Sequence, residues 1–343
     1  TCIYTRGAVG ENTAMTVMPL VLYGLWNLYT MPEDSKAHKD SWLSITAGCT
    51  GIFLSHMIST EIAAVFIVLS AVLCGKRFFS KRTLLTAGKA VLATVFLNLW
   101  FLVPFLDYMV SGTYVINNAD KYSSYRIEQT GVSVAQLLMS DYTAFGHSTP
   151  ASEGITSEMP LTVGIALILV LAGWFLMCTC RGEGVEGGRK TEFLAVFFSC
   201  LSLWMATSLF PYTWLADKMP LFELPIVSIQ YLWRNLSVAA LMLCWLCCLI
   251  LQKERIPQER RKLFLGVLVA LSLLQGWSYM SRCLQNGEVY RVYQAGNMST
   301  VETMDSSEEK DSSVMGGEYL PVDWTEAFAV EDYLASYTKG LSY

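Results

Sequence analysis

The sequence carries little charge for its length. Of 343 residues only 15% are charged, whereas 53% are hydrophobic, and the mean hydropathy is +0.39. Soluble domains carry about 25% charged residues, so this composition excludes an ordinary soluble protein and predicts a polytopic membrane protein. The net charge of −5 is less informative, because in membrane proteins the side on which charges lie matters more than their sum.

The motifs of soluble enzymes are also lacking. The sequence contains no Gly-rich phosphate loop, nucleophile elbow or paired zinc motif. Cys178 and Cys180 are separated by one residue instead of the two usual in zinc sites, and no histidine lies nearby. Most of the ten cysteines fall in or beside apolar tracts, where we expect them to serve as small packing residues.

Apolar tracts predict about eight membrane-spanning helices. They lie at about 13–29, two within 42–74, and at about 84–106, 159–180, 191–211, 234–251 and 263–281. The tract 42–74 is too long for one helix, and the polar segment 55–61 interrupts it, so we expect two short spans joined by a polar hairpin. Pro19 lies within the first span and predicts a kink.

The basic residues predict the orientation of these spans. The loops 30–41, 75–90, 181–190 and 252–262 hold fifteen of the 24 Lys and Arg residues. Eight spans place all four loops on one face, which the positive-inside rule assigns to the cytoplasm. The segments 1–12, 55–61, 107–157, 212–233 and 282–343 would then lie outside. A single pass through 42–74 would instead move residues 1–12 inside, and this alternative stays open.

The pattern also predicts a domain organisation. Residues 1–282 form a transmembrane domain, 283–316 an acidic flexible linker, and 317–343 the start of an extracytoplasmic domain. Since the chain opens on Thr1 a few residues before a span, we expect an N-terminal part to precede it. The long outer loop 107–157 is typical of a functional loop, and its segment 132–139 is apolar enough for a short helix on the membrane surface.

Arg234 is the main candidate for a binding residue. Pro220 and Pro225 interrupt the approach to the span at 234–251, so non-helical backbone is expected at membrane depth beside a cavity. An arginine costs roughly 2.5–3.5 kcal/mol at mid-bilayer, and less near its edge, unless water, a partner or an anion is close. An anion site is therefore one interpretation, and an arginine that snorkels to the interface is the other.

Other ionisable residues are predicted on the same outer face, which favours a joint site. They are Arg6, Glu11, His56, Glu61 and Asp107. Each has a simpler explanation: Arg6 and Glu11 as a solvated pair, His56 in a solvated hairpin, Glu61 near a helix N-terminus capped by Ser59 or Thr60, and Asp107 at a solvated helix end.

Several short motifs occur in one order along residues 4–321. They are Tyr4-x-Arg6 followed by Gly10-Glu11, Ser55-His56, Leu224-Pro225 with Gln230-Tyr231-Leu232-Trp233-Arg234, and Glu318-Tyr319-Leu320-Pro321. In these the chain resembles the bacterial membrane proteins labelled "6-pyruvoyl-tetrahydropterin synthase-related", which are similar to YfhO-type and other GT-C polytopic glycosyltransferases. Pterin synthesis itself needs three histidines on one zinc ion, and His38 is expected on the opposite side from His56 and His147. We therefore exclude that chemistry.

The resemblance implies a GT-C-like enzyme of the bacterial cell membrane. It would move a sugar from a polyprenyl-phosphate carrier to a cell-envelope glycan or lipid acceptor at the outer face. Arg234 and Arg6 would bind the donor phosphate, with Tyr4, Tyr231 and Trp233 nearby. The usual catalytic carboxylate would precede residue 1, which leaves Glu11, Glu61 and Asp107 as acid–base candidates. His56 would steady the phosphate or a divalent cation, the one candidate cofactor.

Two other functions stay open. One is a transporter or flippase of a lipid-linked sugar or polysaccharide, and the other is a non-catalytic membrane scaffold. Membrane lipids are expected partners in every case, and nucleic acid is not.

Overall fold

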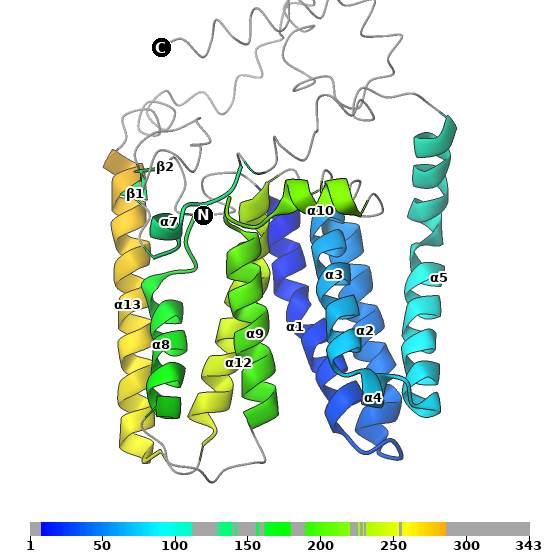
Figure 1. Cartoon of the computed structure of the whole chain (residues 1–343), viewed down its shortest axis with the longest axis horizontal. Coiled ribbons are helices and arrows are strands. Elements are labelled where there is room, and N and C mark those ends of the chain that lie inside the picture. The colour runs from blue at the N-terminus through cyan, green and yellow to red at the C-terminus, as the bar shows by residue number, and fades with distance from the viewer. Residues whose placement is uncertain are drawn as a thin grey trace, which may run out of the picture. The chain divides into compact units, whose positions relative to one another are not determined.

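A computed structural model describes residues 8–111, 128, 130–138, 141–142, 156–157, 161–179, 189–219, 226, 229, 231–253 and 256–285. The longer helices are α1 (Val9–Thr30), α2 (Lys36–Ser55), α3 (Met57–Leu73), α5 (Lys81–Ser111), α8 (Ile165–Thr179), α9 (Arg189–Met205), α12 (Leu236–Leu251) and α13 (Gln258–Gln285) (Figure 1). The shorter elements are α4 (Gly75–Phe78), α7 (Val134–Leu138), α10 (Tyr212–Lys218), the 3-10 helix η4 (Leu232–Asn235) and the paired strands β1 (Asp141–Tyr142) and β2 (Thr156–Ser157). The fold is all-helical apart from this one short pair of strands among the described residues.

The chain divides into two compact units. The first comprises Thr1–Asn98 and Ser124–Val289, and the second comprises Leu99–Ser123 and Tyr290–Tyr343. In the second unit the described residues are the last part of α5, which runs through Pro104. The predicted linker and outer domain lie outside the described residues, except for the end of α13. The site described below lies in the first unit.

Each tract predicted as a span contains a helix, but the helices differ in length and polarity. Among the described residues, two helices are long and apolar enough to cross a membrane, Lys81–Tyr108 and Leu232–Leu251. Met57–Leu73 and Ile165–Cys178 are apolar but shorter. The two longer helices indicate association with a membrane. The predicted count of eight spans is not supported by helix length and composition.

The tract 42–74 is divided between two helices, as predicted. α2 ends at Ser55 and α3 begins at Met57, and the backbone of His56 between them is extended. The prediction of a polar hairpin over 55–61 is wrong, because the segment from Met57 onward is already the first turns of α3. Only His56 separates the two helices, so the polar residues that follow it have helical backbone.

Glycines bring α1 and α2 into close contact. A Cβ atom on Gly24 would lie 2.5 Å from Ile45 Cγ1 and 2.9 Å from its backbone nitrogen. A Cβ atom on Gly48 would lie 2.5 Å from Val21 Cγ2 and 2.8 Å from its backbone nitrogen. The two backbones therefore approach within the space that a methyl group would need. Small residues at such contacts are the usual means by which helices associate in lipid.

Part of the loop 107–157, which is predicted to lie outside, is packed into the protein. Its helix α7 confirms the short helix predicted over 132–139. Val132 and Gln136 are fully buried and Leu137 is 8% exposed, whereas Val134 is 52% exposed. One side of the segment therefore packs against the protein, and its position on the membrane surface stays a prediction. Val132 and Leu137 share a core cluster with Trp233. The buried apolar residues of this segment are thus explained by packing against the protein.

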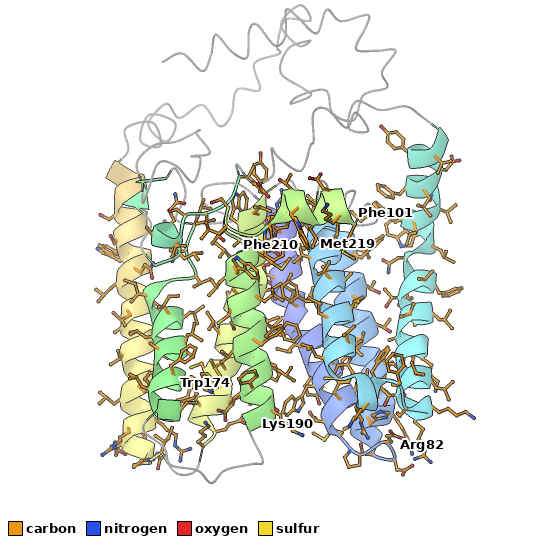
Figure 2. The ribbon with its side chains drawn as sticks, viewed as in Figure 1. Arg82, Phe101, Trp174, Lys190, Phe210 and Met219 are labelled. Carbon is orange, nitrogen blue, oxygen red and sulfur yellow. The ribbon has the colours of Figure 1, made fainter. Side chains whose placement is uncertain are left out.

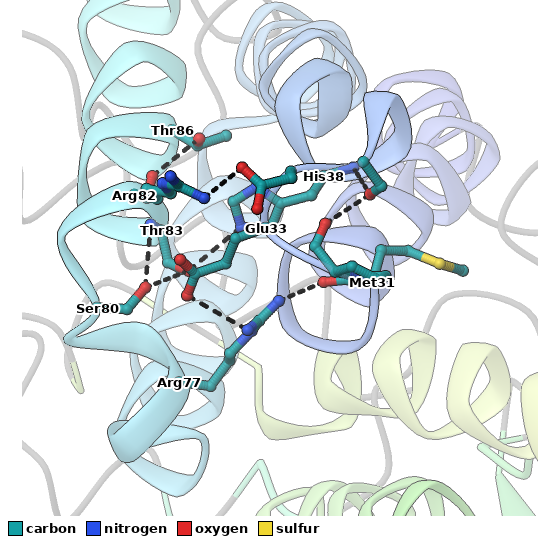
Figure 3. A network of polar contacts seen from close by, with 11 residues as sticks. Met31, Glu33, His38, Arg77, Ser80, Arg82, Thr83 and Thr86 are labelled. Atoms are coloured by element: carbon teal, nitrogen blue, oxygen red, sulfur yellow. Dashed lines mark hydrogen bonds and ion pairs between the residues drawn. The ribbon is translucent and has the colours of Figure 1, made fainter.

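Ion pairs join two of the basic loops. The Arg77 guanidinium donates to Glu33 Oε1 at 3.3 Å and to the Met31 carbonyl, and Arg82 pairs with Asp34 (Figure 3). These contacts connect the loop 30–41 to the loop 75–90. They place the two loops at the same end of the helices, as predicted.

The other basic segments meet at that same end. Lys253 Nζ lies 2.7 Å from Glu192 Oε2, which joins the end of α12 to the start of α9. Lys190 lines one hollow together with Lys76 and Arg77. We call this end of the first unit the basic end. Its composition agrees with a common side for the four basic loops.

Candidate functional site

Arg234 lies in η4, directly before α12. Its side chain is only 8% exposed. The guanidinium Nη1 donates a hydrogen bond of 3.0 Å to the carbonyl of Ile229, five residues earlier. The simple snorkelling interpretation is therefore incomplete, because the head group is buried and bonded to the backbone. A full positive charge is held at the start of a helix.

Two aromatic rings pack against this guanidinium. Tyr231 and Trp233 are stacked, with ring centroids 5.1 Å apart and an interplanar angle of 22°. Arg234 Cζ lies 5.2 Å from the Tyr231 centroid and 5.7 Å from the Trp233 centroid. Each such cation–π contact contributes roughly 0.5–2 kcal/mol. Tyr231 and Trp233, which the resemblance places near the donor phosphate, thus hold the arginine in place.

Hydrogen bonds from distant segments hold the backbone of η4. The Leu232 N–H donates to Thr130 Oγ1 at 3.2 Å, and Ser202 Oγ donates to the Asn235 carbonyl at 2.6 Å. Asn235 Nδ2 closes the turn on the Leu232 carbonyl at 3.0 Å. Leu232 and Asn235 are both fully buried. Segments from the outer loop and from α9 therefore fix the position of Arg234.

The electrostatics of this region favour an anion. The N-terminus of a helix carries about half a positive charge, and Arg234 adds a full one at the start of α12. Burial weakens the screening of both by water. A phosphate or carboxylate is the complementary partner, since the guanidinium fork can bind either with two parallel hydrogen bonds.

The start of α1, which carries Gly10 and Glu11, meets the junction of α2 and α3 at the end of the helices opposite the basic end. A Cβ atom on Gly10 would lie 2.4 Å from the Ser55 carbonyl oxygen and 3.9 Å from His56 Cβ. The first turn of α1 therefore lies against the junction of α2 and α3. Glu11, in that turn, is 4% exposed. Two motifs of the family resemblance, Gly10-Glu11 and Ser55-His56, thus meet in space.

His56 has a structural role that the sequence did not indicate. Its Nδ1 accepts a hydrogen bond of 3.2 Å from the Ser59 N–H and lies 2.9 Å from Ser59 Oγ. His56 is therefore the N-cap of α3, and the prediction of capping by Ser59 or Thr60 is wrong. Glu61 follows one turn later and is not in the first turn of α3. Its explanation as an acid in the first turn fails for the same reason.

The remaining candidates are placed as follows. Ile62, next to Glu61, and Leu232, near Arg234, belong to one core cluster. Asp107 lies exposed on α5 in the second unit. Tyr4 and Arg6 lie outside the described residues.

Within the described part of the chain, no group of three or more His, Cys, Asp or Glu side chains is arranged to hold a metal ion. The described residues therefore do not supply a set of ligands for a divalent cation at His56.

No family model, curated protein or solved structure matches the chain. The resemblance to GT-C glycosyltransferases accordingly stays a hypothesis, and the geometry around Arg234 and Glu11 has to support the function.

Proposed function

We propose that the protein is a membrane glycosyltransferase. It moves a sugar from a polyprenyl-phosphate carrier to a cell-envelope acceptor, and Arg234 binds the donor phosphate. The observation that carries this proposal is the burial of the Arg234 guanidinium at the positive end of α12, against Tyr231 and Trp233. A buried cation held in this way suits a lipid phosphate better than a soluble anion, because apolar and aromatic groups surround it.

The proposal includes the orientation and the remaining roles. The chain crosses the membrane eight times in a GT-C-like arrangement, with the basic end in the cytoplasm and Arg234 at the outer face of a bacterial cell membrane. Glu11, beside His56, is the first choice for the base that takes the acceptor proton. Glu61 and Asp107 are supporting carboxylates, and Arg6 and Tyr4 assist at the donor phosphate.

A cavity observation weighs against the transporter. One cavity runs along α1, α3, α9 and α12. At the end away from the basic loops it is lined by apolar side chains such as Met18, Ile52, Ala63 and Val238. A sugar moved along this path would lose its hydrogen bonds to water without replacing them. The described residues therefore favour chemistry at one face over passage of a sugar through this cavity.

The test uses the full-length protein in proteoliposomes with a labelled polyprenyl-phosphate sugar. Arg234→Lys keeps the charge but loses the bidentate fork, and we expect it to lower kcat/KM for transfer by about 10- to 100-fold. Glu11→Gln should also lower transfer, with little change in donor binding.

The chain offers a matched control for the Lys variant. Arg261 donates from Nε to the carbonyl of Ile256, five residues earlier, just as Arg234 donates to Ile229. Arg261→Lys should leave transfer unchanged. Equal transfer by Arg234→Lys and wild-type protein would refute the phosphate role of Arg234, whereas no transfer by the wild-type protein would favour a scaffold. Movement of the intact carrier without transfer would favour the transporter.

A further inference from the structure

A narrow cavity runs between α1, α3, α9 and α12. Its volume is about 270 Å³. Trp26 and Trp245 both line it and contact each other edge to face, with centroids 5.4 Å apart. Its polar lining residues, among them Ser70 and Thr191, lie towards the basic end. We call this cavity the slot.

The slot meets a wider hollow of about 1120 Å³ at the basic end. Tyr29, Cys74, Lys190 and Leu194 line both spaces, so the two lie side by side. Three cations line the hollow: Lys76, Arg77 and Lys190. Figure 2 shows Lys190 at this end of α9, on the same level as the lower part of α8. None of the described residues that line either space is acidic.

Two acids at the basic end are paired with cations, one of them with Arg77 of the hollow. Glu33 pairs with Arg77 at 3.3 Å, and Glu192 pairs with Lys253 at 2.7 Å. Glu192 also accepts a hydrogen bond of 2.9 Å from Trp174 Nε1. Lys76 and Lys190 are exposed at the opening. The combined space is thus apolar inside and cationic at its mouth.

We propose that an anionic phospholipid binds here, with its phosphate between Lys76, Arg77 and Lys190 and one acyl chain in the slot. The slot is near the lower end of the roughly 300–1,000 Å³ of small-molecule sites, which suits one chain and excludes a whole lipid. Moving a chain from the bilayer into the protein gains little hydrophobic energy. The selectivity therefore comes from the cations at the mouth, which distinguish an anionic head group from a zwitterionic one.

This site is separate from the donor site proposed above. Lys190 begins α9, whereas Ser202, near the other end of α9, contacts the element that holds Arg234. Lipid binding at the basic end therefore does not depend on glycosyl transfer. An experiment can refute one of the two proposals and leave the other standing.

Native mass spectrometry of the full chain tests the head group. The protein is exchanged into mixed micelles of phosphatidylglycerol and phosphatidylcholine with identical chains, and the ratio of retained lipids is measured. We expect wild-type protein to retain phosphatidylglycerol preferentially. Lys76→Gln with Lys190→Gln should reduce that preference by about fivefold per lysine, or about 25-fold for the pair. Arg77 is left unchanged because it holds the loop at Glu33.

A matched double variant controls for charge. Lys36→Gln with Lys39→Gln removes two exposed lysines from the start of α2, and neither lines the slot or the hollow. This variant should keep the wild-type preference. Equal retention of the two lipids by wild-type protein, or equal effects of the two double variants, would overturn the proposal.

A second experiment tests the chain. Phosphatidylglycerol brominated on its acyl chains should quench Trp26 and Trp245 inside the slot, and Trp26→Phe with Trp245→Phe should remove this part of the quenching. The control is Trp277 on α13, which is 75% exposed. Brominated phosphatidylglycerol and brominated phosphatidylcholine should both quench it, and Trp277→Phe should remove that unspecific part of the quenching. Quenching unchanged by the slot variant would show that no chain enters the slot. Inorganic phosphate that displaces the lipid completely would show that the head group alone is recognised, which would also overturn the proposal.

Discussion

Because α1 and α2 are in close contact, we expect glycine-to-alanine substitutions at two positions to change the free energy of unfolding in opposite directions. Gly48→Ala adds a methyl group where the Val21 backbone nitrogen lies 2.8 Å away. Gly88→Ala adds the same group on α5, where nothing lies within 4 Å. In both helices alanine is favoured over glycine by about 1 kcal/mol on helix propensity alone. The difference between the two variants therefore measures the packing.

The magnitude follows from these distances. Overpacking costs about 1–3 kcal/mol, and the upper part of that range applies at Gly48 because a backbone atom cannot rotate out of the way. After the propensity gain, we expect Gly48→Ala to lower the free energy of unfolding by about 1–2 kcal/mol. Gly88→Ala should raise it by about 0.5–1 kcal/mol.

The assay is equilibrium unfolding in mixed micelles, followed by far-UV circular dichroism. Gly24→Ala should behave like Gly48→Ala, since Ile45 blocks its methyl group at 2.5 and 2.9 Å. The double variant should be less destabilised than the sum, because separation of the helices by one methyl group makes room for the other. If Gly48→Ala is as stable as Gly88→Ala, the close approach of the two helices is wrong.

Two further predictions concern the basic end and the orientation. The pKa of His38 is lowered, first by burial and then by the Arg77 charge, so the unfolded chain binds a proton first as the pH falls. Stability should therefore be full above about pH 6.5 and decrease below it, and thermal unfolding of His38→Gln should lack this slope. For the orientation, a cysteine at the exposed position Lys218 should react with an impermeant thiol reagent from outside intact cells, in a background without native cysteines, while one at the exposed position Lys39 should not. The reverse pattern would invert the proposed orientation.

The sequence alone predicted those features of the fold that depend on one short segment. The break between α2 and α3 follows from a polar interruption in an overlong apolar tract, and the position of Arg234 at the start of a helix follows from two prolines before it. Loop charges placed four segments at one end, and the ion pairs of Arg77 and Lys253 agree with this.

Properties that depend on two distant segments could not be read in this way. The glycine contacts of Gly24 and Gly48 become visible only when α1 and α2 are paired. The packing of Val132 against the protein could not be predicted either, because an apolar segment has the same pattern against lipid and against protein. His56 illustrates the same limit: the ring that suggested a ligand is the N-cap of the helix that follows it.

The lengths of the two short apolar helices α3 and α8 bear on the membrane thickness that suits the protein. α3 has 17 residues and α8 has 15. At 1.5 Å per residue they are only about 25 and 22 Å long, against a hydrocarbon thickness of about 30 Å. In the proposed eight-span topology both helices cross the bilayer, which would have to become thinner beside them, at an elastic cost that grows with the thickness of the undisturbed membrane. The protein should therefore partition towards thin, easily compressed membranes and away from thick, ordered ones.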